Sequence, residues 1–199
     1  MVIAAKAPEE RRRRILAAVV EVLRERGYAG TRVADIATAA GTSPGLVLYH
    51  FSSLAGALTE ALTTLEDAFY DDLERDLAAT DGPVEKLRHM AELGSGSGPA
   101  VGDWTLWLEL WVRALHDPSA RAAREQLDRR WRTCLREVVD EGVASGVFRT
   151  ASAADATVRL ASLMDGLAIQ LALEDEGMTP ERMQSLWLAS AALELDAPV

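Results

Sequence analysis

Residues 40–54 combine residue types that can bind an anionic backbone or the edge of a base. The segment reads AGTSPGLVLYHFSSL, with a Ser-Pro pair, a glycine one residue later, and then Tyr49 and His50. A serine followed by a proline predicts a helix that starts near residue 43 with a side-chain cap. The N–H groups at such a start attract anions, and Gly45 would let the backbone approach them closely. By position alone, Tyr49 and His50 fit a packing or surface role equally well.

A second helix precedes this segment at a spacing that defines a known motif. Helical patterns over residues 32–39 and 43–50 are joined by the turn 40–42, which has a glycine where a left-handed residue is needed. This is the spacing of a helix-turn-helix, in which the second helix enters the major groove of DNA amino end first. Val47 and Phe51, one turn apart, are expected to anchor that helix to the preceding ones.

The charge distribution favours a polyanionic partner at the amino-terminal end. The chain of 199 residues carries a formal net charge of −10, which as an average argues against nucleic acid. Residues 1–55, however, hold eight lysines and arginines against five acids, a net of +3, so the rest of the chain carries −13. Because phosphate binding needs Lys and Arg, we expect the basic part to meet the anion and the acidic part to keep the molecule soluble.

The sequence pattern predicts an all-α protein with about nine helices. Nearly every segment repeats its apolar residues with helical spacing, and no alternating run predicts a strand. The expected helices are at residues 8–27, 32–39, 43–50, 54–79, 83–93, 103–116, 118–145, 152–175 and 180–195. The expected side-chain caps at helix starts are Ser43, Asp117, Ser152 and Thr179. We expect the glycine-rich stretch 94–102 to be a flexible loop.

Composition and motifs exclude several classes of protein. The lone Cys134 cannot form an internal disulfide, and with only three histidines the chain offers no closed metal site. We therefore expect no metal and no cofactor. No apolar run is long enough for a membrane span, and the charged amino terminus predicts a location in the cytoplasm. The sequence contains no nucleophile elbow and no dinucleotide fingerprint, so we do not expect an enzyme.

The amino-terminal motif resembles a known family of DNA-binding proteins. The stretch GYAGTRVADIATAAGTSPGLVLYHF, preceded by ILAAVVEVLRERGY, is similar to the DNA-binding domain of TetR family transcriptional regulators. The resemblance implies a three-helix DNA-binding domain, which we place at residues 1–55. It also implies that the tyrosine and histidine touch backbone phosphates, and that the start of the recognition helix reads bases. The DNA-binding set is then Thr31, Arg32, Thr42, Ser43, Pro44, Gly45, Leu46, Tyr49 and His50.

The chain departs from this family pattern at Leu54. The family often reads Phe-x-Ser-Lys, with a lysine that contacts phosphate, whereas this chain reads FSSL and ends the motif on leucine. Leu54 falls on the apolar face of the following helix, so we expect it to pack rather than to bind. One phosphate contact per half-site is then lost, which should lower the salt dependence of binding. The run Arg11–Arg14 is either a compensating arm or a solvated charge run.

The carboxy-terminal part resembles the ligand-sensing domain of a TetR subgroup that includes the choline-responsive repressors. The resemblance rests on WTLWLELWVRALHDPSARAAREQLDRRW, GVASGVFR and LMDGLAIQ, and it implies a homodimer with a pocket in each subunit for an unknown small-molecule effector. A tryptophan stripe is either core or a cage for a flat or cationic ligand. On the far side of that helix, Glu109 and Arg113 are expected to pair. The tentative ligand-binding residues are Trp104, Trp107, Leu108, Trp111, Trp131, Met164 and Asp165.

The last two expected helices each carry two apolar stripes, which predicts a dimer interface. A helix that buries more than one stripe is central in its domain or shared with a second subunit, and we favour a two-fold dimer through a four-helix bundle. We therefore place a ligand-binding and dimerisation domain at residues 56–199. The expected interface residues are Leu160, Ala161, Ala168, Ala172, Trp187, Leu188, Ala191 and Leu195.

These expectations together describe a DNA-binding transcriptional regulator. The simplest version is a repressor that binds a palindromic operator as a homodimer and is released by a ligand. Such a ligand would push on helix 54–79 and move the DNA-binding heads away from a spacing of about one helical turn, ~34–36 Å. The alternative is a helical protein that binds a small molecule or a partner but not DNA.

Overall fold

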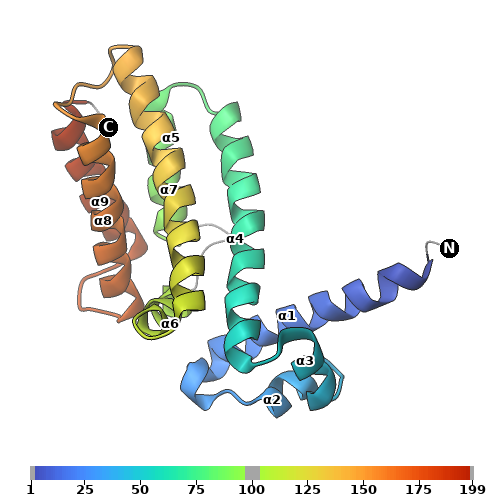
Figure 1. Cartoon of the computed structure of the whole chain (residues 1–199). Helices are drawn as coiled ribbons and strands as arrows, with labels where there is room; N and C mark the ends of the chain where they lie inside the picture. Colours follow the sequence, from blue (N-terminus) through green and yellow to red (C-terminus); the bar gives the residue numbers. More distant parts are fainter. Residues whose placement is uncertain (1–2, 97–103, 198–199) are drawn as a thin grey trace. The chain divides into compact units, whose positions relative to one another are not determined.

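The computed structural model describes residues 3–96 and 104–197, with only the backbone placed for residues 3–8. Within these ranges the chain forms nine α-helices and no strand (Figure 1). Their bounds are α1 (Ile3–Gly30), α2 (Val33–Ala39), α3 (Pro44–Phe51), α4 (Leu54–Ala79), α5 (Pro83–Gly94), α6 (Trp104–Ala114), α7 (Pro118–Ala144), α8 (Ala153–Ala172) and α9 (Pro180–Leu195). The predicted all-α class is confirmed.

The helix bounds agree with the sequence prediction to within three residues except at the start of the first helix. α1 begins at Ile3, five residues before the predicted start, so the expectation that Pro8 occupies its first position is wrong. Its regular part ends where predicted, because Gly27 adopts φ 65° and ψ 172° and breaks the helix. Only glycine enters this region of φ/ψ space at little cost. Most of the predicted loop 94–102 lies outside the described residues.

The four predicted helix caps are confirmed by hydrogen bonds to free N–H groups of the first turn. The Ser43 hydroxyl accepts from the Leu46 amide, and Thr179 accepts from the Arg182 amide. Ser152 caps α8 and Asp117 caps α7 in the same manner. Each bond satisfies a donor that has no partner inside its own helix, which explains why the chain starts helices at these points.

The chain forms two compact units. The first contains Met1–Asp67 and Thr105–Arg124, and the second contains Ala68–Trp104 and Glu125–Val199. The boundaries therefore fall inside the continuous helices α4 and α7 and at the start of α6. The predicted division at residues 55 and 56 concerns function rather than compactness and stays a prediction.

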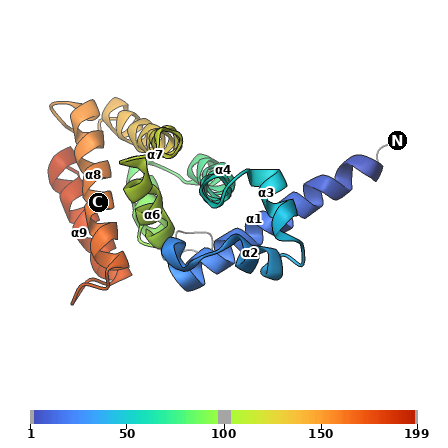
Figure 2. The same cartoon turned by 60° about the horizontal axis from the view of Figure 1, so that its bottom comes forward.

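The first unit is built around a three-helix head. α2 and α3 lie beside α1, as Figures 1 and 2 show, and the apolar faces of the three helices meet. The predicted anchors Val47 and Phe51 are both buried, as are Ile15, Val19 and Ile36. Burying these side chains holds α3 against α1 and α2 and leaves its amino end at the surface.

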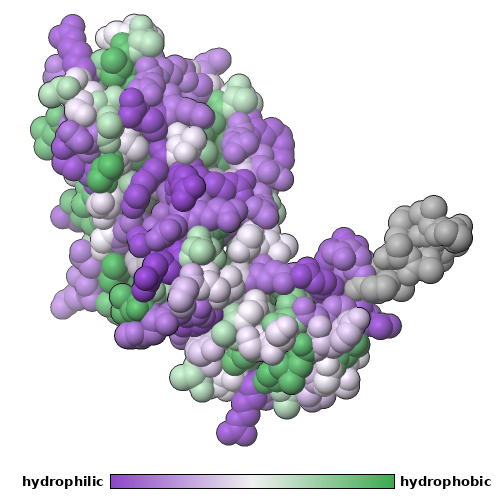
Figure 3. Space-filling view, in the orientation of Figure 1, coloured by the Kyte–Doolittle hydropathy of each residue, from purple (hydrophilic) through white to green (hydrophobic). Residues whose placement is uncertain are grey.

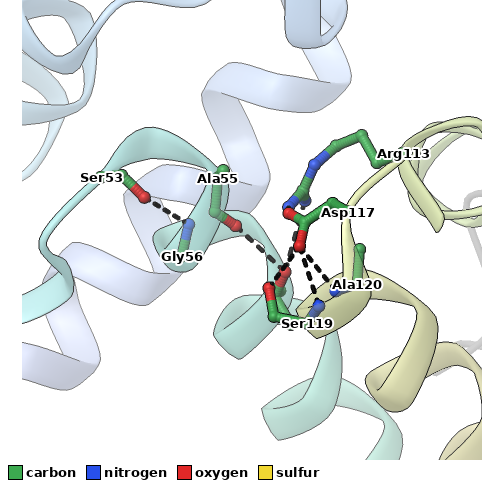
Figure 4. Close-up of polar contacts among 8 residues, drawn as sticks. Ser53, Ala55, Gly56, Arg113, Asp117, Ser119 and Ala120 are labelled. Carbon is green, nitrogen blue, oxygen red and sulfur yellow. Dashed lines mark hydrogen bonds and ion pairs between the residues drawn. The ribbon is translucent and has the colours of Figure 1, made fainter. Parts of the chain in front are cut away.

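The start of α4 packs closely on the end of α3. Ser52 ends α3 in a left-handed conformation (φ 60°), and the Ser53 Oγ accepts a hydrogen bond of 3.0 Å from the Gly56 amide (Figure 4). A Cβ atom on Gly56 would lie 2.5 Å from the Phe51 carbonyl oxygen, which is far inside van der Waals contact. A glycine is therefore needed here for the two helices to approach. Leu54, at the same junction, is half-buried.

The second unit has its own core between the second half of α4, α5, most of α7, α8 and α9. α8 packs on α9, and α9 packs on α5. The indole N–H of the fully buried Trp187 donates to the Leu160 carbonyl at 2.9 Å, and the Tyr70 hydroxyl donates to the Leu127 carbonyl at 3.2 Å. These two bonds join α9 to α8 and α4 to α7, so the aromatic residues fix pairs of helices as well as fill space.

Candidate DNA-binding surface and effector site

The amino end of α3 is open at the surface of the head. Ser43, Pro44 and Gly45 are all exposed, and the Ser43 side chain already satisfies the Leu46 amide at 3.3 Å. No atom outside its own turn lies within 4 Å of the position a Cβ would take on Gly45. Pro44 has no N–H, and the Leu46 and Val47 amides already bond to Ser43, so the Gly45 amide is the first-turn donor that a phosphate or a base edge can reach at this exposed tip.

The aromatic pair at the end of α3 differs in exposure. Tyr49 is 81% exposed, whereas His50 is half-buried. Their rings meet edge to face with centroids 5.4 Å apart, and His50 also lies beside the buried Phe51. Leu48 is exposed as well. Figure 3 shows hydrophobic surface over the part of the head that α2 and α3 form. Tyr49 thus contacts His50 while most of its side chain remains open to solvent.

One residue of the predicted DNA-binding set is used inside the protein. Thr31 is buried, and its hydroxyl donates to the Gly27 carbonyl at 2.7 Å. Its side chain stabilises the break in α1 and is not available to DNA, so we remove it from the candidate contacts. Arg32 is exposed at the start of α2, and Thr42 and Leu46 are partly exposed.

The four arginines at positions 11–14 have different surroundings. Arg12 forms an ion pair with Glu60 on α4, and its guanidinium lies 5.3 Å from the centroid of the Phe51 ring. Arg13 pairs with Glu10. Arg11 and Arg14 are exposed, and within the part of the chain that the structure describes neither side chain forms a hydrogen bond, an ion pair or a ring contact. The run is therefore not a uniform arm, since Arg12 serves to hold α1, α3 and α4 together.

Among the expected effector residues, Trp104, Trp131, Met164 and Asp165 belong to the second unit. Trp104 and Trp131 pack against its core, and Met164 is buried in that core. The Trp104 indole donates to the Gly94 carbonyl at 3.2 Å, whereas the Trp131 indole nitrogen, like that of Trp111, is buried without a hydrogen-bond partner among the described residues. A buried N–H without a hydrogen-bond partner is costly to the folded state.

The other three expected effector residues lie in the first unit. The Trp107 indole donates to Glu66 on α4 at 3.2 Å, and the rings of Trp107 and Trp111 are tilted against each other at 6.3 Å. Leu108 is half-buried. The tryptophan stripe predicted on one helix is thus divided between the two units, and Trp107 is committed to binding α4.

The predicted dimer-interface residues are mostly buried inside the protomer. Six of them are buried, and only Ala172 and Leu188 are partly exposed; the buried six are Leu160, Ala161, Ala168, Trp187, Ala191 and Leu195. Their apolar character is accounted for by the core of the second unit. The exposed apolar side chains of this region lie elsewhere, at Val158 on α8, at Leu173 directly after its end and at Leu193 on α9, with Ile169 of α8 partly exposed.

The sequence analysis missed a set of polar contacts around α6. Glu109 and Arg113, which were expected to pair with each other, bind different partners. Glu109 accepts from the Tyr28 amide, and Arg113 donates to Thr59 and to Asp117 (Figure 4). Spacing along the sequence identifies neighbours on one helix, but it does not identify partners that lie 54 or 81 residues away in the chain.

Across residues 3–96 and 104–197 no three His, Cys, Asp or Glu side chains gather where they could hold a metal ion. None of the helices in these ranges combines the length and apolar character needed to cross a membrane.

Comparison with known proteins assigns the chain to a family. Residues 15–56 match the family described as bacterial regulatory proteins, tetR family, and residues 83–196 match the BetI-type transcriptional repressor C-terminal domain. The chain belongs to the TetR family. The first match contains the whole of α2 and α3, and the second contains α5 to α9.

Relatives of this TetR-family protein share most of its length. HTH-type transcriptional regulator BetI of Ectopseudomonas mendocina is 29% identical over 186 residues, covering 88% of this chain and 89% of the relative. BetI of Burkholderia mallei is 30% identical over 173 residues, covering 84% and 85%. These similarities identify a helix-turn-helix transcriptional repressor of the BetI type, in a family whose members regulate transcription and generally are not enzymes.

Solved structures show the same fold. A transcriptional regulator from Saccharomonospora viridis, crystallised in complex with choline, is 30% identical and superposes with a TM-score of 0.84 over 90% of this chain and 94% of that one. A TetR transcription regulator from Haloarcula marismortui is 25% identical, with a TM-score of 0.82 over 94% and 99%. The TetR fold of this chain is therefore supported along nearly its whole length.

Proposed function

We propose that this TetR-family protein is a homodimeric repressor released by a small cationic effector. The two α3 helices of the dimer would occupy successive major grooves of a palindromic operator, and the amino end of each helix would contact the DNA. The observation that carries the proposal is the exposed amino end of α3 at residues 43–45, which Ser43 caps and which the buried core of the three-helix head holds in place. An amino end placed for packing would be covered by other side chains.

The proposed contacts with DNA are of two kinds: contacts with phosphates position the protein, and contacts with bases read the sequence. Tyr49 supplies an exposed hydroxyl that can donate to a phosphate, and Gly45 allows the backbone to come within hydrogen-bond distance of one. Leu46 and Thr42, beside the tip, would meet base edges, where an apolar side chain can contact a thymine methyl group. Arg32 and His50 would add contacts at the edge of this surface.

A pair of substitutions tests the proposal. We expect Tyr49→Ala with His50→Ala to weaken operator binding at least tenfold, because two phosphate contacts are removed from each half-site. His116→Ala, which removes an exposed histidine near the end of α6, is the matched control and should bind as the wild type does. Fluorescence anisotropy with an operator duplex measures both. An intact dimer that binds equally well after the double substitution would show that α3 does not read DNA.

Arg11 and Arg14 are the best candidates for replacing the phosphate contact missing at Leu54. Both are exposed and are not paired with any of the described residues, so their charges are available to DNA. Arg12 is excluded from this role by its contacts with Phe51 and Glu60. We propose that the two free arginines bind the DNA backbone outside the helix-turn-helix, which adds affinity but no sequence selectivity.

The dimer would form through the exposed face of α8 and α9. Val158 and Ile169 share one face of α8, Leu173 follows directly after the helix at the same spacing, and Leu193 of α9 is 87% exposed. Isolated apolar side chains at the surface are common, but a row on adjacent helices fits a two-fold four-helix contact. We therefore assign the interface to these side chains in place of the buried set named from sequence.

A quaternary ammonium ion is the effector class that the second unit fits best. The faces of Trp104 and Trp131 can attract such a cation, and the unpartnered Trp131 indole can donate to a hydroxyl on the same ligand. The choline bound by the S. viridis relative has both groups. We propose choline or a similar compound, acting in the cytoplasm.

Release would follow from the helices that run through both units. α4, α6 and α7 each contain residues of the first and the second unit, so a rearrangement around the effector is transmitted along the backbone. The two heads would leave the spacing of about one helical turn, ~34–36 Å, that the operator requires. Tryptophan fluorescence during choline titration, followed by operator binding at saturation, tests both steps.

A further inference from the structure

The end of α1 is bound by a carboxylate from α6. Gly27 breaks α1, and the following amide, that of Tyr28, donates to Glu109 Oε1 at 3.0 Å. A half-buried N–H beside a helix break needs such an acceptor, and a charged one gives a stronger bond than a neutral one. Glu109 thus connects α6 to the last turn of the helix on which the head is built.

Arg113 lies one turn further along α6 and contacts three other elements. Its Nη1 donates to Thr59 Oγ1 on α4 at 3.3 Å, and its Nη2 donates to Asp117 Oδ2 at 3.1 Å. Its guanidinium carbon is 5.5 Å from the centroid of the Tyr28 ring. Only 10% of the Arg113 side chain is exposed, so these partners replace the water that the charge has lost.

The partners of Arg113 are themselves fixed. The Thr59 hydroxyl donates to the Ala55 carbonyl at 3.0 Å, which orients its lone pair toward the guanidinium (Figure 4). Asp117 accepts from the Ser119 hydroxyl and amide and from the Ala120 amide. These bonds, with that of Ser119 first, lower the pKa of Asp117 to about 2, so its charge persists at any physiological pH.

We propose that Glu109 and Arg113 are positioning residues that clamp the DNA-binding head to α6. The head and Thr105–Arg124 belong to the same compact unit, and the clamp joins them at the end of α1 and the start of α4. The head then moves with α6 as one body and does not swing alone on α4. The inference rests on the proposed function, because the body it defines carries the α3 tip.

With the clamp in place, the position of α6 determines the distance between the two half-sites that the dimer can bind. Without it the head is held mainly through α4, a single helix that can bend, and each α3 tip can reach half-sites at altered distances. We therefore expect loss of the clamp to lower the preference for one half-site spacing over another more than it lowers the affinity for a single half-site. A coupling between sites commonly changes affinity by about 5- to 150-fold, and we expect about tenfold here.

The test uses full-length protein and a duplex that the wild type selects from genomic fragments, together with versions in which the half-sites are one base pair closer or further apart. Arg113→Met and Glu109→Leu should lower the preference for the natural spacing about tenfold. Glu109→Gln, which keeps an acceptor, should retain most of it. Arg136→Met, at an exposed ion pair on α7, is the matched control. Thr59→Val removes one hydrogen bond of the clamp with little change of shape, and it replaces Arg113→Met in the test if that variant fails to fold.

Amide hydrogen exchange gives a readout that does not depend on DNA. In Arg113→Met and Glu109→Leu the Tyr28 amide should exchange about tenfold faster than in wild type, while amides in the core of the second unit stay protected. Unchanged Tyr28 protection, or unchanged preference for the natural spacing in folded variants, would overturn the clamp. Failure of the wild type to select any duplex would instead refute the proposed function, and the exchange data would still decide on the clamp.

Discussion

Gly56→Ala is expected to destabilise the protein, although the same change in an exposed helix usually stabilises it. Alanine has a helix propensity about 1 kcal/mol better than glycine. Here the added Cβ would lie 2.5 Å from the Phe51 carbonyl oxygen, whereas real Cβ contacts are essentially never under 3.0 Å. The obstacle is backbone, so α4 must shift away from α3, and forced packing of this kind costs about 1–3 kcal/mol. Because Gly56 lies in the first turn of α4, where the propensity gain is smallest, we expect a net loss of about 1–2 kcal/mol.

Urea unfolding measures this change, with Gly45→Ala as the matched control. No atom outside its own turn lies within 4 Å of a Cβ on Gly45, and its φ is not in the left-handed region, so that variant should be as stable as the wild type. It should nevertheless bind operator more weakly, because the added methyl group holds the backbone away from DNA. If Gly56→Ala proves as stable as the wild type or more so, the described packing of α4 on α3 is incorrect.

Three further changes have expected outcomes. Replacing Arg11 and Arg14 by Gln should reduce the slope of log binding constant against log salt by about two per half-site, whereas Arg13→Gln should leave it unchanged; equal slopes would remove the two arginines from the DNA contact. Trp187→Phe should lower the free energy of unfolding by about 1–3 kcal/mol, because the Leu160 carbonyl loses its donor, and an unchanged urea midpoint would contradict this. Burial, and then Glu74 and Glu137, raises the pKa of Cys134 to about 11, so a thiol reagent at pH 8 should label it only after unfolding; rapid labelling of folded protein would contradict the burial.

The bounds of the helices could be predicted from sequence where neighbouring residues alone determine the start of a helix. Ser43 and Thr179 precede prolines and accept bonds from first-turn amides, so both helix starts follow from neighbouring residues alone. The start of α1 could not be found in this way. The prediction took Pro8 as the first residue of the helix, but α1 begins at Ile3, so proline there did not mark the boundary.

The candidate sites were predictable only in part, because apolar periodicity does not say what covers a face. Ala161 and Ala168 form a regular second stripe on α8, which suits a dimer interface and an interior equally, and they are buried within the protomer. Arg12 was indistinguishable in sequence from Arg11 until its contact with the Phe51 ring was seen. The open tip at Ser43 was predictable, since capping and turn residues act locally.

Selection of bound genomic fragments by the purified protein tests the central claim most directly. We expect the recovered fragments to share a palindrome whose half-sites are centred about one helical turn apart, 10–10.5 base pairs. We also expect Tyr49→Ala with His50→Ala to abolish the enrichment while the dimer remains intact. Recovery of no common site by a folded dimer, or of a site that the double variant binds equally well, would contradict the account.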